Sequence, residues 1–229
     1  MSDRPSEPRT KRRPAASAQT LHSAGRVHAP VRRSYDSLAA SYDTRWRHYI
    51  EATSALAIEP IPPEACGRAL NIACGTGELE RRLHELRPQL RLTGTDLSLN
   101  MLHRAAAKRL GADWLAAVAA HLPLVDASFD YVLCVNAFHY FRLPAESLAE
   151  MRRVLRPGGT LVLVDWCDDY LSCKLCSAWL RLTDRAFYRT YSLTDCRTSL
   201  EQAGLQIVSA QRRRINWLWG LMQFVCRAP

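Results

Sequence analysis

Two glycines and an aspartate in the first part of the chain could hold a nucleotide-like ligand. The stretch ACGTGE at residues 73–78 places Gly75 and Gly77 directly after an apolar run. Glycine permits positive φ angles and leaves backbone N–H groups accessible to a ligand. About twenty residues later a second apolar run ends at Asp96, where a carboxylate can accept hydrogen bonds from a ribose diol. Together these residues predict a site for an adenosine-type cofactor.

A second group of side chains could remove a proton or contact a substrate. His139 follows another apolar run in the stretch NAFHYF, and an unperturbed imidazole has a pKa of about 6.5. Tyr140 is its neighbour, and Asp165 ends a later apolar run beside Trp166. We predict His139, Tyr140 and Asp165 as candidate catalytic residues. Aromatic packing for the two rings and helix capping for the aspartate are the alternatives.

Short apolar runs alternate with helical patterns along most of the chain. The expected strands lie at residues 69–73, 90–95, 113–118, 130–135, 160–165, 205–210 and 217–225. The expected helices include residues 79–86 and 99–110; RPGG at 156–159 is interpreted as a turn, and QRRR at 211–214 as the link between the last two strands. This order predicts an α/β fold, a Rossmann-like, doubly wound, mostly parallel seven-stranded sheet with helices on both faces. Ligands on such sheets bind at the carboxyl ends of the strands, where Gly75 and Asp96 lie.

The charge of the chain is concentrated at its beginning. The chain has 229 residues and a formal net charge of +9, which suits one folded domain. Residues 1–33 carry eight basic and two acidic side chains and few large apolar ones, so we expect a disordered basic tail there and a folded domain at 34–229. Because the body carries little of the charge, we do not expect nucleic acid as a partner.

The cysteines and the hydropathy pattern indicate a cytoplasmic protein. The eight cysteines are scattered through apolar segments, which is typical of reduced thiols. Cys167, Cys173 and Cys176 lack the second pair of ligands that a zinc site needs, so we expect no metal. No apolar run has the roughly 18 residues needed for a transmembrane segment, and no secretory signal is evident.

Several stretches resemble the class I S-adenosylmethionine-dependent methyltransferases of the small methyltransferase-domain type. These are SYDSLAASYD at 34–43, LNIACGTGEL at 70–79, GTDLSLNML at 94–102, HLPLVDASFDYVLCVNAFHYF at 121–141 and MRRVLRPGGTLVLVDW at 151–166. They occur in the order and spacing of that family. The resemblance implies S-adenosylmethionine as the cofactor. A nicotinamide dinucleotide fits less well because the loop lacks the third glycine of the dinucleotide fingerprint.

The resemblance also implies a role for each matching residue. Ala73, Gly75, Thr76 and Gly77 would surround the amino-acid portion of the cofactor, and Asp96 would bind its ribose. Leu97 and Met101 would lie against the adenine and Asn136 near the sulfonium. The segment at 34–43 would act as a lid and contribute Tyr35 and Tyr42, for which core packing is the alternative.

Two positions depart from the family pattern. Asn71 stands where the family often has an acid on the first strand, and we expect its amide to bond to loop amides instead. Val118 stands where an acid often binds the adenine amino group. The backbone at Ala119 or Ala120, or the His121 side chain, could take its place.

Residues 166–192 are interpreted as a segment that covers the substrate, because insertions at this place cover the acceptor in similar methyltransferases. Their Trp, Tyr, Leu and Cys content fits a small-molecule or lipid-like acceptor, and a core-packing helix is the alternative. The predicted function is therefore methyl transfer to such an acceptor. An RNA methyltransferase and a non-catalytic partner subunit remain the alternative functions.

Overall fold

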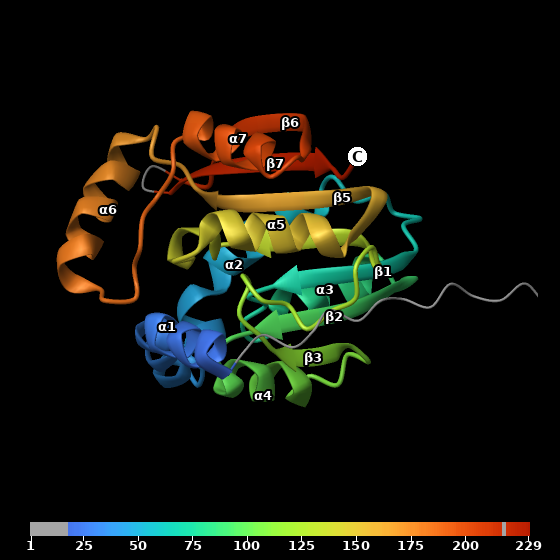
Figure 1. Ribbon diagram of the computed structural model, residues 1–229, viewed down its shortest axis with the longest axis horizontal. Coiled ribbons are helices and arrows are strands. Elements are labelled where there is room, and N and C mark those ends of the chain that lie inside the picture. Colours follow the sequence, from blue (N-terminus) through green and yellow to red (C-terminus); the bar gives the residue numbers. More distant parts are fainter. Residues whose placement is uncertain (1–17, 217–218) are drawn as a thin grey trace, which may run out of the picture.

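A seven-stranded sheet forms the centre of the computed structural model, which describes residues 18–216 and 219–229 (Figure 1). Its strands are β1 (Gly67–Ile72), β2 (Leu90–Asp96), β3 (Asp113–Ala116), β4 (Phe129–Val135), β5 (Leu155–Trp166), β6 (Gln206–Arg214) and β7 (Gly220–Arg227). They lie in the order β3-β2-β1-β4-β5-β7-β6. The first five run parallel, and β7 is antiparallel to both β5 and β6. The predicted α/β, mostly parallel sheet is confirmed.

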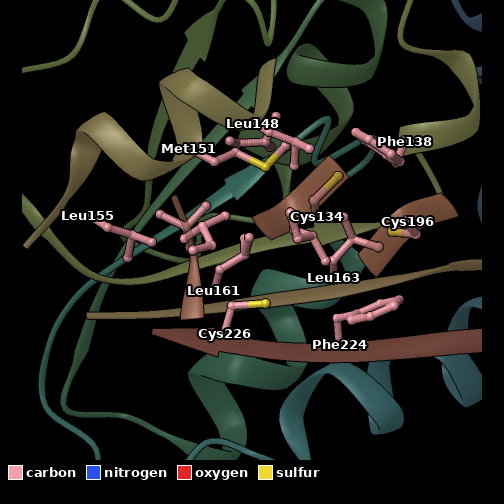
Figure 2. Close-up of a cluster of buried hydrophobic side chains, with 14 of the residues drawn as sticks. Cys134, Phe138, Leu148, Met151, Leu155, Leu161, Leu163, Cys196, Phe224 and Cys226 are labelled. Atoms are coloured by element: carbon pink, nitrogen blue, oxygen red, sulfur yellow. The ribbon is translucent and has the colours of Figure 1, made fainter. Parts of the chain in front are cut away.

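Helices cover both faces of this sheet. They are α1 (Ala18–Leu38), α2 (Tyr42–Ile58), α3 (Glu78–Leu86), α4 (Leu99–Ala107), α5 (Pro144–Val154), α6 (Leu171–Thr183) and α7 (Leu193–Gln202). Leu161 and Leu163 of β5 pack with α5 and α7 in one buried cluster, part of which is drawn in Figure 2. Val162 and Val164 pack with α2 and α3 in the other cluster. This alternation is the two-residue period of a strand buried on both faces.

The first helix corrects the prediction of disorder at residues 1–33. Helix α1 begins at Ala18, so residues 18–33 are helical, while residues 1–17 lie outside the described part of the chain. The end of α1 is fixed by the loop that starts α4. The Ser98 hydroxyl donates to the Asp36 carboxylate, and the Asn100 amide donates to the Asp36 carbonyl at 3.1 Å. Such contacts offset the ordering entropy that composition alone could not.

Two predicted turns lie inside strands. The QRRR stretch is the end of β6, and the chain reverses only after Arg214. An edge strand tolerates these charged side chains because much of it faces solvent. The expected last strand begins at Gly220, and Trp217 and Leu218 lie outside the described residues. RPGG likewise belongs to β5, where the pairing with β4 shifts register and Gly158 has a φ of 75°.

We expect Leu163→Ala to lower the free energy of unfolding by about 2–5 kcal/mol, because it empties a fully buried site in a central strand. Val208→Ala, on an exposed position of β6, is the control and should change it by less than about 0.5 kcal/mol. The measurement is urea denaturation followed by circular dichroism. Equal effects from both variants would contradict the packing described for β5.

Candidate active site

The loops that follow β1, β2, β3 and β4 surround one cavity at the carboxyl edge of the sheet. Its volume is about 810 Å³. The wall consists of residues after each strand, together with part of α1: His28, Val31, Arg32, Tyr35, Ala73, Gly75, Asp96, Leu97, Ala117, Val118, Ala119 and Asn136 among others. This is the position that the strand order predicts for a ligand, since the connections diverge on either side of β1 and β4.

Asp96 connects the end of β2 with the glycine-rich loop after β1. Its carboxylate accepts the Gly75 N–H and the Ser98 N–H, both at 2.8 Å. Burial raises the pKa of Asp96, and the backbone hydrogen bonds from Ser98 and Gly75 oppose that rise. A carboxylate has about four acceptor positions, so Asp96 retains acceptor capacity for further hydroxyl donors. The loop itself needs glycine, because Gly75 and Gly77 have φ angles of 56° and 78°.

Helix α2 is fastened to the same loop by a cluster of charges. The Thr76 hydroxyl donates to the carboxylate of Asp43, near the start of α2. The Lys108 ammonium lies 2.9 Å from Asp43 and 2.6 Å from Glu78, and it donates to the Thr76 carbonyl at 2.7 Å. Lys108 therefore holds the start of α2 against the loop.

A second cavity of about 1090 Å³ adjoins the first. Tyr35, Tyr42, Asn136 and Tyr140 line both cavities. The rest of the second wall is strongly aromatic and includes Trp46, Tyr49, Trp166, Trp179 and Trp219, with His139 among them. Such a wall fits an apolar or aromatic molecule, and the four shared side chains form the boundary between the two spaces.

His139 and Asp165 form a buried pair at the wall of the second cavity. His139 lies in a short 3-10 helix after β4, and Asp165 lies near the end of β5. The His139 Nδ1 is 2.6 Å from one carboxylate oxygen, and the other oxygen accepts the His139 backbone N–H at 2.9 Å. The imidazole also stacks on the Trp166 ring, with 5.1 Å between the ring centroids. When Nδ1–H donates to Asp165, Nε2 carries the lone pair of the neutral imidazole, and it has no hydrogen-bond partner among the described residues.

Asn136 is held rigidly at the boundary of the two cavities. The Tyr49 hydroxyl donates to its Oδ1 and its Nδ2 donates to the Thr53 hydroxyl, both at 2.8 Å. Tyr49 in turn accepts a hydrogen bond from the Trp166 indole at 2.6 Å. This chain of bonds connects α2 with the ends of β4 and β5.

Comparison with known proteins shows what the central part of the chain resembles. Residues 70–163 match the model of the methyltransferase domain. The chain is 39% identical over 133 residues to the demethylmenaquinone methyltransferase of Deinococcus radiodurans. This alignment covers 56% of this chain and 52% of that protein. It is 34% identical over 137 residues to the malonyl-(acyl-carrier protein) O-methyltransferase of Hahella chejuensis, covering 58% of this chain and 48% of that protein. The chain carries a stretch, residues 70–163, that matches a methyltransferase domain.

A solved structure agrees with this family at the level of the fold. A Haloferax volcanii protein described as a methyltransferase, solved in a complex with a methyltransferase activator, matches with a TM-score of 0.75 and 22% identity. The match covers 85% of this chain and 97% of that one. The chain spans about half the length of the curated relatives that it matches first.

Most of the sequence-predicted residues of the methyltransferase meet at the two cavities. Those that line the first cavity are Tyr35, Tyr42, Ala73, Gly75, Asp96, Leu97, Ala119, Asn136 and Tyr140. His139 lines the second cavity, and the buried Asp165 carboxylate is hydrogen-bonded to the His139 imidazole. Thr76 and Gly77 complete the loop, where Thr76 bonds to Asp43 and Gly77 precedes α3. Met101 is fully buried in α4, and in the described part of the chain it is not among the residues that line either cavity.

Sequence reasoning missed His28, which α1 brings to the wall of the first cavity beside Val118 and Ala119. The side chain is 7% exposed, and its buried Nε2 has no partner among the described residues. Burial lowers the pKa of His28, and the nearby charges of Arg142 and His121 lower it further. No sequence motif predicts a binding role for His28, because the segment around it has the composition of a disordered tail.

Asn71 does not bond to loop amides as we expected. Its Nδ2 donates to the Glu80 carboxyl at 3.1 Å, so the acid near β1 is supplied by α3. The Asn71 Oδ1 and the Glu80 Oε2 are buried without a partner in the described structure. Burial raises the pKa of Glu80 to about 8. Burial of the Asn71–Glu80 pair therefore favours the protonated, uncharged form of the Glu80 carboxyl.

Glu80→Gln should make the stability of the protein less dependent on pH. A folded-state pKa of about 8 exceeds the unfolded value near 4.5, so the wild type loses stability as pH rises between these values. The variant lacks this titration and should exceed the wild type by at least about 1 kcal/mol at pH 8. Thermal unfolding from pH 5 to pH 8.5 measures the difference. Glu85→Gln, on the exposed side of α3, is the control, and parallel curves for Glu80→Gln and the wild type would contradict the assignment.

Proposed function

We propose that this methyltransferase transfers a methyl group from S-adenosylmethionine to a small, lipid-like acceptor. The observation that carries the proposal is the shared wall of the two cavities at Tyr35, Tyr42, Asn136 and Tyr140. A donor in the first cavity and an acceptor in the second would meet at these residues. Holding two reactants in line accounts for a large part of the rate gain in a displacement of this kind.

The first cavity fits the donor by the chemistry of its polar groups. When bound, S-adenosylmethionine supplies a methyl group that its sulfonium already activates. The remaining acceptor positions of Asp96 suit the two ribose hydroxyls, and the Gly75 loop leaves backbone room for the amino-acid portion. The unpartnered Nε2 of His28 suits the adenine end, where Val118 offers no acceptor. A neutral imidazole can accept a hydrogen bond from an amino group, and the lowered pKa of His28 favours that neutral form.

The second cavity favours an acceptor with a flat ring and an apolar part. Its tryptophans and tyrosines offer broad apolar faces, and relatives of this chain are named as demethylmenaquinone and ubiquinone/menaquinone methyltransferases. We infer a quinol-like or similar aromatic acceptor on this basis. The aromatic wall would also keep water away from the reacting groups.

His139 is proposed as the base that removes the proton from the acceptor. Its Nε2 would accept that proton as the acceptor forms its bond to the methyl carbon and the carbon–sulfur bond breaks. Asp165 would hold the Nδ1 proton and stabilise the resulting imidazolium, in the way that a carboxylate orients a catalytic histidine elsewhere. The Tyr140 ring packs against the His139 imidazole, with 4.2 Å between the ring centroids. Tyr140 would also contact the acceptor.

Binding of S-adenosylhomocysteine tests the donor site without knowledge of the acceptor. At one hundred times its Kd the ligand should add about 2.7 kcal/mol of stability, a rise of several degrees in Tm. Asp96→Asn should weaken binding at least about tenfold, and His28→Phe should weaken it by several-fold. Asp113→Asn, an exposed aspartate at the start of β3, is the matched control. A Tm rise with a nicotinamide dinucleotide but not with S-adenosylhomocysteine would contradict the proposal, and no rise with either would favour a non-catalytic subunit.

Turnover of a short-chain demethylmenaquinol separates proton removal from donor binding. His139→Gln should lower kcat by about 10²–10⁴-fold while leaving the Kd for S-adenosylhomocysteine unchanged. Asp165→Asn should lower kcat as well, because the amide no longer selects the Nδ1–H tautomer. His103→Gln, on an exposed position of α4, serves as the control. An unchanged kcat in His139→Gln would exclude the histidine as the base.

A further inference from the structure

Helix α6 presents a row of large apolar side chains to solvent. Leu171, Leu175, Trp179 and Leu182 are 71%, 64%, 63% and 88% exposed. At 3.6 residues per turn these four positions lie within about 80° of the helix circumference, so they form one continuous stripe. Figure 1 shows α6 at the outer left edge of the molecule, away from the helices that cover the sheet. Large exposed apolar patches of this kind on a soluble protein mark interaction surfaces.

The opposite side of α6 belongs to the second cavity and to the body of the protein. Cys173 and Ser177 are buried, and Cys176 and Leu180 line the cavity wall. Trp179 belongs to both sides, since it lines the cavity and is also largely exposed. The apolar stripe is therefore continuous with the proposed acceptor site. Ser34, Tyr35 and Leu38 of α1 line the same cavity.

Basic side chains accompany the stripe. Residues 171–189 contain four basic side chains and one acid, Asp184. Lys174 and Arg181 are exposed and lie seven residues apart, which places both along the same flank of the stripe. Arg185 follows directly after the helix, and the exposed Arg45 of α2 lines the same cavity. The stripe thus has a basic flank at Lys174 and Arg181, while Arg45 and one acid, Asp184, line the cavity beside it.

We propose that α6 docks this methyltransferase on an anionic lipid surface, so that a lipid-like acceptor enters the second cavity directly from the membrane. The acceptor part of this inference rests on the proposed function. An apolar stripe with basic residues beside it and a tryptophan at its edge is the pattern of a helix that lies in the plane of a membrane surface. Among the described residues no helix has the length and apolar character to cross a bilayer, so contact through α6 would be peripheral.

The basic flank favours a membrane over a second copy of this chain as the occupant. A symmetric pairing of two α6 stripes would bring Lys174 and Arg181 of both copies together, and like charges oppose such a contact. Anionic lipid headgroups instead complement these side chains, and this attraction weakens as salt screens it.

Vesicle flotation with the full chain tests the proposal. Vesicles of phosphatidylcholine with 30% phosphatidylglycerol, roughly the anionic content of many membranes, are compared with pure phosphatidylcholine vesicles. We expect at least about tenfold tighter partitioning to the anionic vesicles, decreasing between 50 mM and 500 mM salt. The variant Leu175→Asp/Leu182→Asp should lower that partitioning at least about tenfold. The matched control, Leu86→Asp/Val208→Asp, changes two exposed apolar residues on α3 and β6 by the same charge and should bind like the wild type.

The other outcomes overturn the proposal. These are an absence of vesicle binding by the wild type, equal loss in both double variants, or a dimer in sedimentation that Leu175→Asp/Leu182→Asp dissociates without any vesicle binding. S-adenosylhomocysteine binding, measured on the same preparations, should be the same in both double variants and the wild type. Vesicle binding without S-adenosylhomocysteine binding would refute the proposed function and leave the docking surface standing. The reverse result would refute the docking surface alone.

Discussion

The parallel pairing of β1 with β2 on one side and β4 on the other is the constraint on which the rest of the structure depends. It brings the carboxyl ends of strands from distant parts of the chain to one edge, where Asp96 can accept the Gly75 N–H. Backbone bonds continue this alignment, since the Cys74 N–H donates to the Thr95 carbonyl and the Asn136 N–H to the Val164 carbonyl. The loops at this edge are short and directly connected to buried strands, which gives the cavity a rigid base.

The N-terminal helices are attached to this edge through two acids. Asp36 of α1 bonds to the residues that start α4, and Asp43 of α2 bonds to Thr76 and Lys108. Because both carboxylates have partners on the sheet side, α1 and α2 cover the first cavity and also complete its wall. The first cavity is therefore made from parts that lie on both sides of the glycine-rich loop in the sequence.

The second cavity has a different physical character. Its aromatic rings pack on one another, as Trp219 does on Trp166 at 4.7 Å and on Tyr49 at 5.2 Å. The His139–Asp165 pair lies within this apolar wall because β4 and β5 are neighbours and their ends coincide. An imidazole held by a buried carboxylate, an aromatic wall and an apolar stripe on α6 together support the proposal of an acceptor that is poorly soluble in water.

The alternation of apolar runs and the spacing from Gly75 to Asp96 determined the fold class, the glycine-rich loop and most of the residues that line the first cavity. These features depend on local periods and on short loops, which a sequence displays directly. His28 and the pairing of Asn71 with Glu80 were decided by tertiary structure, because each requires a helix to bring one residue against a distant strand or loop. The helical state of residues 18–33 was decided in the same way. Their composition does not offset the entropy of ordering, whereas contacts of α1 with the start of α4 do so only once the sheet has formed.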